Sequence, residues 1–271
     1  MRKIFLFVCF TMLVCFAWTI VRAQASGSVS EDEVISQAKM KELVQKFKKA
    51  VKTDDPEVIA EYVEYPYARP NPIPDINNKE EFVKQYDMLI DSQLRQDILS
   101  STMQNWDVVG WRGIMLNNGL LWLNTDGKLI AINKETPAEK EYIKNWYEKD
   151  RASLYPSLRD YDANSYIFET KQWKGRIDSL NEKGDDYRLV LWRKTDEMSD
   201  KPEIVIEHGT IDFSETSGSG DYRFNRGDYV YSFTENDTDL DEEKSPYRLV
   251  VYRDNKELSS AEAVLIKGNI D

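Results

Sequence analysis

The chain has 271 residues, of which 41% are hydrophobic and 31% charged, a composition typical of a soluble globular protein with room for two cores. Its 36 basic and 48 acidic residues give a net charge of −12, and this sign argues against a nucleic-acid-binding protein. The chain has one histidine, and Cys9 and Cys15 are its only cysteines. Most zinc sites, Cys–His catalysis and a disulfide scaffold are therefore excluded, and we expect no cofactor and no metal.

The first 25 residues have the three parts of a secretory signal peptide. Arg2 and Lys3 form a positive end, residues 4–20 are apolar and uncharged, and small residues precede cleavage after Ala25 or, alternatively, Ala23. The apolar run is slightly shorter than the roughly 20 residues that span a bilayer, so cleavage is favoured over an uncleaved anchor. Loss of the signal removes both cysteines and makes the net charge −15. The sequence predicts a periplasmic or secreted protein without stable membrane insertion.

Two amphipathic helices are predicted after the signal. Ser30 and Glu33 have the spacing of a capping box, and apolar residues then recur every three or four positions, which predicts a helix over about 31–51. Asp55 followed by Pro56 is typical of a second helix start. This second helix must end before Pro66.

A third helix and a set of short strands follow. Asn78 with Glu81 is a further capping box, opening a helix to Leu89 or as far as Ile98. Strand-like segments separated by Asn- and Gly-rich turns then predict an antiparallel meander, with strands at 106–112, 114–116, 120–123 and 129–132.

One more predicted helix separates the first half of the chain from the second half. Thr136, Pro137 and Glu139 predict a helix to about Ala152, and a polar connector continues to Ser165. From there the chain consists of strands and turns. The predicted organisation is a signal peptide over 1–25, an α+β domain over 26–133, a linker helix and connector over 134–165, and a β-domain over 166–271.

The β-domain contains a near-repeat. Residues 187–193 (YRLVLWR) match residues 247–253 (YRLVVYR), and residues 204–206 with Gly209 match residues 264–266 with Gly268. Two copies of a strand–turn–strand unit predict an all-β sandwich or barrel with internal pseudo-symmetry.

The first half also carries a family resemblance, over about residues 34–133. It depends on the order of six segments: 47–51, 53–56, Tyr65-Pro66, 78–82, Trp111-Arg112-Gly113 and 119–122. In this order the chain resembles the nuclear-transport-factor-two-like, or SnoaL-like, cone family. The resemblance implies an α+β cone, in which helices packed on a curved antiparallel sheet enclose a pocket. The second half resembles C-terminal β-domains of exported proteins of unknown function.

The resemblance implies two alternatives for the pocket. Enzymes of the family place an Asp there, often with a His or Tyr partner, but the first domain has no histidine. A lyase or isomerase could draw an Asp/Tyr pair from Asp97, Asp107, Tyr67 and Tyr86, although no spacing selects them. The other alternative is a pocket that only binds a ligand.

Six residues are candidates for lining such a pocket. Three tryptophans cluster on the meander, Arg112 could anchor an anionic group, and two tyrosines accompany them: Trp106, Trp111, Trp122, Arg112, Tyr67 and Tyr86. The alternative interpretation is that the tryptophans fill the core and that Arg112 is an ion-pair partner at the rim.

Motifs in the β-domain favour structural roles. Its many aromatic residues are typical of a core face, with glycan stacking as the alternative. Asp237, Asp239 and Asp241 resemble the start of a calcium loop, but Glu242 and Arg248 stand where an EF-hand needs glycine and glutamate, which leaves at most a weak site. His208, which precedes a glycine, is expected to be a turn residue.

These observations predict an exported, non-catalytic binding or accessory protein of the bacterial envelope. Its partners would be a small molecule in the first domain and an envelope protein or glycan at the β-domain, and no nucleic acid. The alternative is the Asp/Tyr lyase or isomerase. A third hypothesis, from the net charge, is electrostatic capture of a basic envelope protein. No pattern indicates an oligomeric state.

Overall fold

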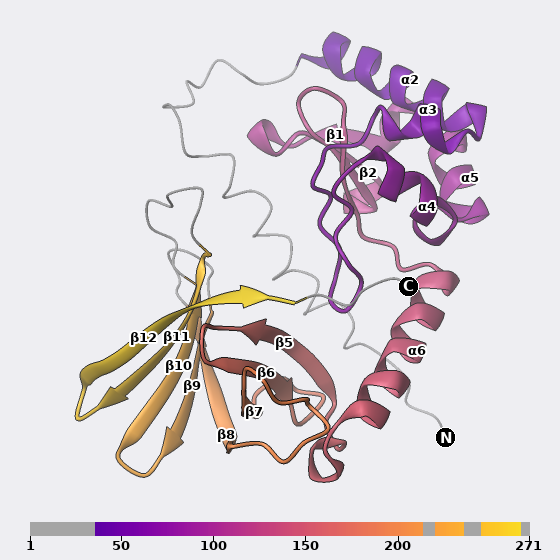
Figure 1. The fold of residues 1–271 in the computed structure, drawn as a ribbon. Coiled ribbons are helices and arrows are strands. Elements are labelled where there is room, and N and C mark those ends of the chain that lie inside the picture. Colours follow the sequence, from indigo (N-terminus) through magenta and orange to yellow (C-terminus); the bar gives the residue numbers. More distant parts are fainter. Residues whose placement is uncertain (1–35, 214–219, 236–244, 267–271) are drawn as a thin grey trace, which may run out of the picture. The chain divides into compact units, whose positions relative to one another are not determined.

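A computed structural model describes residues 36–213, 220–235 and 245–266 (Figure 1). The chain forms two compact units that divide between Lys144 and Asn145. The predicted signal peptide, the Asp237–Asp241 run and Gly268 lie outside the described residues.

Among the residues that the structure describes, no helix combines the length and apolar character needed to cross a membrane.

The first unit combines short helices with a small sheet. Its elements are α2 (Gln37–Thr53), α3 (Pro56–Ala60), α4 (Lys79–Leu89), α5 (Ser92–Ser100), η2 (Met103–Asn105), β1 (Trp106–Val108), η3 (Gly110–Arg112), β2 (Ile114–Leu116), η4 (Asn117–Gly119), β3 (Leu121–Leu123), β4 (Leu129–Ile132) and the start of α6 (Pro137–Ser153).

Side-chain caps determine where these helices begin. The predicted caps Asp55 and Asn78 are confirmed, because their carboxylate and amide oxygens accept backbone N–H groups in the first turns of α3 and α4. Ser36 caps α2, and the predicted cap Ser30 lies outside the described residues. The third helix ends at Leu89, the shorter of the two predicted ends, and Asp91 caps a separate helix, α5.

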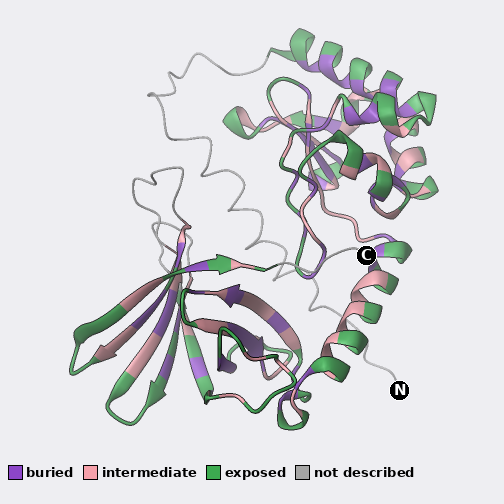
Figure 2. Cartoon of the chain, in the orientation of Figure 1, coloured by how far each residue is buried: buried purple, intermediate pink, exposed green. Residues whose placement is uncertain are grey.

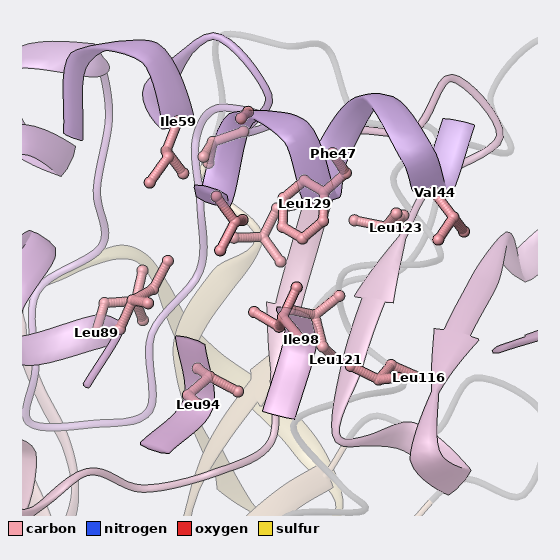
Figure 3. Packing of buried hydrophobic residues seen from close by; sticks show 14 of the residues in the cluster. Val44, Phe47, Ile59, Leu89, Leu94, Ile98, Leu116, Leu121, Leu123 and Leu129 are labelled. Atoms are coloured by element: carbon pink, nitrogen blue, oxygen red, sulfur yellow. The ribbon is translucent and has the colours of Figure 1, made fainter. Parts of the chain in front are cut away.

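The core of the first unit lies between α2 and the sheet. The apolar residues of α2 face inward along one side, and Figure 2 shows the alternation of buried and exposed positions along this helix. Val44, Phe47 and Leu123 are fully buried, with leucines of the sheet and of α5 around them (Figure 3). Each such side chain contributes roughly 1.5–3 kcal/mol when it leaves water.

The sheet is an antiparallel meander in the order β1-β2-β3-β4, as the sequence predicted. One face carries core residues such as Trp106 and Leu116, which are paired across β1 and β2. The other face carries Met115 and Trp122, paired across β2 and β3.

The predicted fold class, an α+β cone followed by an all-β sandwich or barrel, was wrong. No strand of the first sheet exceeds four residues, which is too short to curve around a pocket, and its inner face is filled by core side chains. The strands are short because turns interrupt them. Gly113, for example, has φ 99° and lies so close to β3 that an added Cβ would meet the Leu123 carbonyl oxygen at 2.1 Å.

The second unit contains a single sheet closed on itself, not two stacked sheets. Eight antiparallel strands follow the end of α6 and η5 (Pro156–Leu158), in the order β10-β11-β12-β5-β6-β7-β8-β9. The strands are β5 (Ala163–Glu169), β6 (Trp173–Ser179), β7 (Tyr187–Arg193), β8 (Ile204–Phe213), β9 (Gly220–Arg226), β10 (Tyr229–Glu235), β11 (Tyr247–Arg253) and β12 (Lys256–Leu265).

The barrel has two related halves, β5–β8 and β9–β12 (Figure 1). In each half the long last strand, β8 or β12, pairs with the first strand of the other half. The repeat of β7 in β11 is structural: Tyr187 and Tyr247 are both buried at the same position of their strands. The second matched segment is offset, because Gly209 lies opposite Tyr187 whereas Ala263 lies opposite Tyr247. The connections differ in length, 194–203 in one half and 254–255 in the other.

Aromatic side chains fill the barrel, which confirms the predicted core role. Ring centroids lie 4.6 Å apart for Phe168 and Phe233 and 4.9 Å apart for Tyr187 and Tyr222. A barrel of eight strands is just wide enough for side chains to fill it. Tyr229 is 37% exposed, Tyr231 and Tyr252 are half-buried, and Trp192 packs in a separate cluster with Leu154 and Leu158.

Candidate functional site

The four predicted pocket residues on the meander do not converge. Trp106 is buried in the core, and its indole N–H donates to the Ser101 hydroxyl at 2.9 Å. Trp122 lies on the opposite face of the sheet. Trp111 is 50% exposed on η3, where the Arg112 guanidinium carbon lies 5.6 Å from its ring centroid.

The two predicted tyrosines also have separate surroundings. Tyr67 is buried, where it forms an isolated bridge with Ile76, and burial raises its pKa well above the usual value. The Tyr86 hydroxyl donates to Asp54 at 3.3 Å, and burial followed by the Asp54 charge raises the pKa of Tyr86 to about 12.

The predicted Asp/Tyr site is not assembled either. Asp97 accepts a hydrogen bond from the Gln93 amide at 2.8 Å and lies 3.6 Å from the Lys134 ammonium. Asp107 is an exposed residue of β1. The candidate carboxylates therefore have structural partners or face solvent.

A groove that sequence reasoning missed lies between α2 and the segment that joins α5 to η2. We call it the lysine groove. It has a volume of about 430 Å³, within the range of small-ligand sites, and is lined by Val44, Gln45, Lys48, Lys49, Lys52, Leu99, Ser101, Thr102 and Met103.

Helical periodicity explains why lysines meet apolar side chains there. Val44 belongs to the buried stripe of α2, and Lys48 follows one turn later at the edge of that stripe. Lys49 and Lys52 lie further round the helix and are exposed. The groove therefore has an apolar floor and a cationic rim.

Lys48 is the half-buried member of the rim. Its ammonium donates to the Ser101 carbonyl oxygen, and its Nζ lies 3.3 Å from the Ser101 hydroxyl oxygen. A cation at the carboxyl end of α5 neutralises the partial negative charge of the last carbonyl groups. Desolvation lowers the pKa of Lys48. Lys48 is thus engaged by the protein itself.

The remaining charge of the groove is not balanced locally. Among the described residues no carboxylate lines it, and neither Lys49 nor Lys52 has an ion-pair partner there. The helix as a whole has six lysines and one glutamate, in a chain whose net charge is −12. The groove is therefore a local cationic surface on an acidic protein.

A second groove, of about 650 Å³, has the opposite character. Its carboxylates are Asp55, Glu57, Glu61 and Asp126, beside Val58, Tyr62 and Lys128. Asp55 already caps α3, and Glu61 pairs with Lys79. No group of three or more potential ligand side chains in the described residues is placed to hold a metal ion.

Two buried ionic groups have structural roles. Arg69 pairs with Glu139, which also forms a reciprocal cap with Thr136 at the start of α6. In the second unit, Arg176 and Arg188 both donate to the buried Asp178 carboxylate. None of these residues lines either groove.

His208 lies within β8 rather than in a connecting turn. Its φ of 61° marks a local irregularity of the strand, and Nδ1 lies 3.3 Å from an Asp186 carboxylate oxygen. The imidazole is 80% exposed.

The sequence did contain a signal for the lysine groove. Lys48 and Lys49 belong to segment 47–51, one of the six segments on which the family resemblance depends. There they were interpreted only as the end of a helix. Nothing in the sequence indicated that residues 99–103 would face them, because that contact joins segments about fifty positions apart.

Comparison with models of known protein families, with curated proteins and with solved structures finds no match to this chain.

Proposed function

We propose that this chain is an exported, non-catalytic binding protein of the bacterial envelope, whose first unit holds a small anionic ligand in the lysine groove. The secretory-type first 25 residues support the location. The observation that carries the binding role is the placing of three lysines around the floor formed by Val44, Leu99 and Met103, with no carboxylate in the lining.

The charge of the groove favours an anion. An ammonium group near the surface interacts with a carboxylate or phosphate by about 4 kcal/mol at 4 Å when the effective dielectric constant is near 20. Much of this is offset by desolvation and ordering, so the apolar floor must contribute as well.

Thermal unfolding of the purified protein tests this proposal. The additives are inorganic phosphate, small carboxylates and alkyl phosphates at equal ionic strength. A ligand at about a hundred times its Kd stabilises by roughly 2.7 kcal/mol. We expect the midpoint to rise by several degrees with at least one anion.

The matched control is a pair of double variants of α2. Lys49→Gln with Lys52→Gln should abolish the rise, whereas Lys39→Gln with Lys46→Gln removes the same charge from positions outside the groove and should preserve it. If both double variants lose the rise in midpoint equally, anion binding depends only on the net charge of the protein and not on the lysine groove. No rise with any anion would refute the proposal.

For the second unit we propose that an envelope protein or glycan docks on the outer surface, because the interior is filled by aromatic rings. The exposed apolar side chains of Leu258 and Val264, both on β12, support an outer contact at this strand. Leu258→Lys should weaken retention of the protein on purified envelope fractions. Unchanged retention by this variant and by Val264→Lys would contradict the proposal.

A further inference from the structure

Apart from its lysines and the exposed Gln45 amide, the lysine groove has few hydrogen-bonding groups left for a ligand. The Ser101 hydroxyl donates to the Ile98 carbonyl oxygen at 2.7 Å and accepts the indole N–H of Trp106. The Thr102 hydroxyl donates to the Asn105 amide oxygen at 2.9 Å. Both hydroxyl protons are therefore used inside the protein. A polyhydroxylated ligand would lose hydrogen bonds to water and regain few here.

The floor is apolar and adaptable. Val44 is fully buried, and Leu99 and Met103 are partly buried members of the same core cluster, so their outer surfaces are available to a ligand. The unbranched, polarisable side chain of methionine fits ligands of irregular shape. An alkyl chain that covers this floor stabilises the complex because apolar surface leaves water, whereas a purely polar ion gains nothing from the floor.

The rim is suited to one anionic headgroup. Lys48 is held by Ser101, which leaves Lys49 and Lys52 for a ligand. These two residues are three positions apart, so their Cβ atoms are neighbours at roughly 5–6 Å on the helix surface. Two ammonium groups at this spacing flank a single carboxylate or phosphate.

We infer that the ligand of the lysine groove is a single-chain anionic amphiphile. Its carboxylate or phosphate group lies between Lys49 and Lys52, and its alkyl chain covers the exposed surfaces of Leu99 and Met103. This inference rests on the proposed anion binding and goes further in naming the ligand class.

Titration calorimetry with a series of alkyl phosphates tests the inference. The series contains inorganic phosphate and the butyl, hexyl, octyl and decyl monoesters, each below its micelle concentration. Affinity should rise about three- to fourfold per methylene until the floor is covered. Equal affinity for inorganic phosphate and octyl phosphate would overturn the amphiphile while leaving anion binding intact. No binding by any member would overturn both.

Variants separate the headgroup from the chain. Lys49→Gln with Lys52→Gln should weaken octyl phosphate at least tenfold, while Lys39→Gln with Lys46→Gln should change it less than twofold. Met103→Gln should flatten the dependence on chain length without removing the binding of inorganic phosphate. An unchanged chain-length dependence in Met103→Gln and in Leu99→Gln would place the alkyl chain elsewhere and overturn the inference. Near-ultraviolet circular dichroism verifies that each variant is folded.

The protein could bind the amphiphile either as a free molecule or as a lipid of a bilayer. Vesicles distinguish these two sources. Retention on phosphatidylglycerol vesicles that octyl phosphate displaces, with none on phosphatidylcholine vesicles, would assign a membrane lipid. Binding of octyl phosphate without retention on either vesicle would assign a free amphiphile. Retention on phosphatidylglycerol without any binding of octyl phosphate would overturn the inference.

Discussion

Glu139 shows how burial and pairing compete at a single carboxyl. It accepts hydrogen bonds from Arg69 and from the Thr136 N–H and is almost inaccessible. Burial is nevertheless the largest influence and raises the pKa of Glu139, while its two donors act in the opposite direction. The cost of desolvating a carboxylate can exceed the gain from an ion pair.

This balance predicts a pH dependence. Above the ordinary pKa of 4.5 the unfolded chain releases the Glu139 proton, while the folded chain retains it up to the raised value. The folded state then binds more protons, so the unfolding free energy falls as pH rises through this window. Relative to Glu139→Gln, the urea midpoint of the native protein should therefore decline from about pH 4.5 upward. If the urea midpoint of the native protein instead rises with pH relative to that of Glu139→Gln, the ion pair with Arg69 outweighs burial and lowers the pKa of Glu139.

Gly175 shows the effect of a missing side chain inside the barrel. A Cβ at this position would lie 2.2 Å from the Phe168 ring. Gly175→Ala should lower the unfolding free energy by about 1–3 kcal/mol, as overpacked cores do. In a Phe168→Leu background the same change should cost less, because the ring is gone. A cost that is equal in both backgrounds, measured by denaturant unfolding, would refute the clash.

At the scale of elements, the carboxyl-terminal half of α6 is fixed on the barrel by ionic groups. Asp150 of α6 accepts from Arg176 at 3.0 Å, and Asp178 accepts from both Arg176 and Arg188. The Tyr161 ring lies between two guanidinium groups, 4.6 Å from Arg151 and 5.0 Å from Arg176. Hydrogen bonds satisfy most donors of these guanidinium groups, although the buried Arg188 Nε–H has no partner among the described residues. The group specifies how this half of the helix sits on β6 and β7.

Asp178→Ala should destabilise the second unit by about 3–5 kcal/mol, because it leaves two buried guanidinium groups without their shared carboxylate. The same substitution should accelerate the hydrogen exchange of the backbone amides of residues 145–153. Arg151→Gln is the control, since that side chain is partly exposed and should cost far less. If the two variants exchange alike, the ionic group does not hold the helix.

Elements were predictable where a local signal determines them. Thr136 with Glu139, Asp55 and Asn78 are caps whose partners lie within three residues, and the structure contains all of them. The predicted apolar stripe of the first helix is confirmed in α2, whose cap is Ser36, while the predicted cap Ser30 lies outside the described residues. The sequence left the end of the third helix open between Leu89 and Ile98, and the structure ends α4 at Leu89 and begins α5 after Asp91.

For the whole molecule, the charge and the first 25 residues predict an exported acidic protein. Mass spectrometry of the protein recovered outside the cytoplasm should find an amino terminus at Ser26 or Gln24. Without the signal, the chain has no cysteine, so reducing agents should leave its melting temperature unchanged. Recovery only inside cells, with Met1 retained, would contradict the predicted export.

The sequence by itself determined the composition class, the meander, the caps of α3, α4 and α6 and the aromatic core of the second unit, because each depends on residues close together in the chain or on a simple period. Only the tertiary structure decided that the second unit closes into one barrel, which depends on β12 reaching β5 through Val264 and Leu265. It also decided where a ligand could bind. The predicted tryptophans are separated by the two faces of the sheet, while Lys49 and Lys52 meet Leu99 and Met103 through a contact that no local pattern encodes.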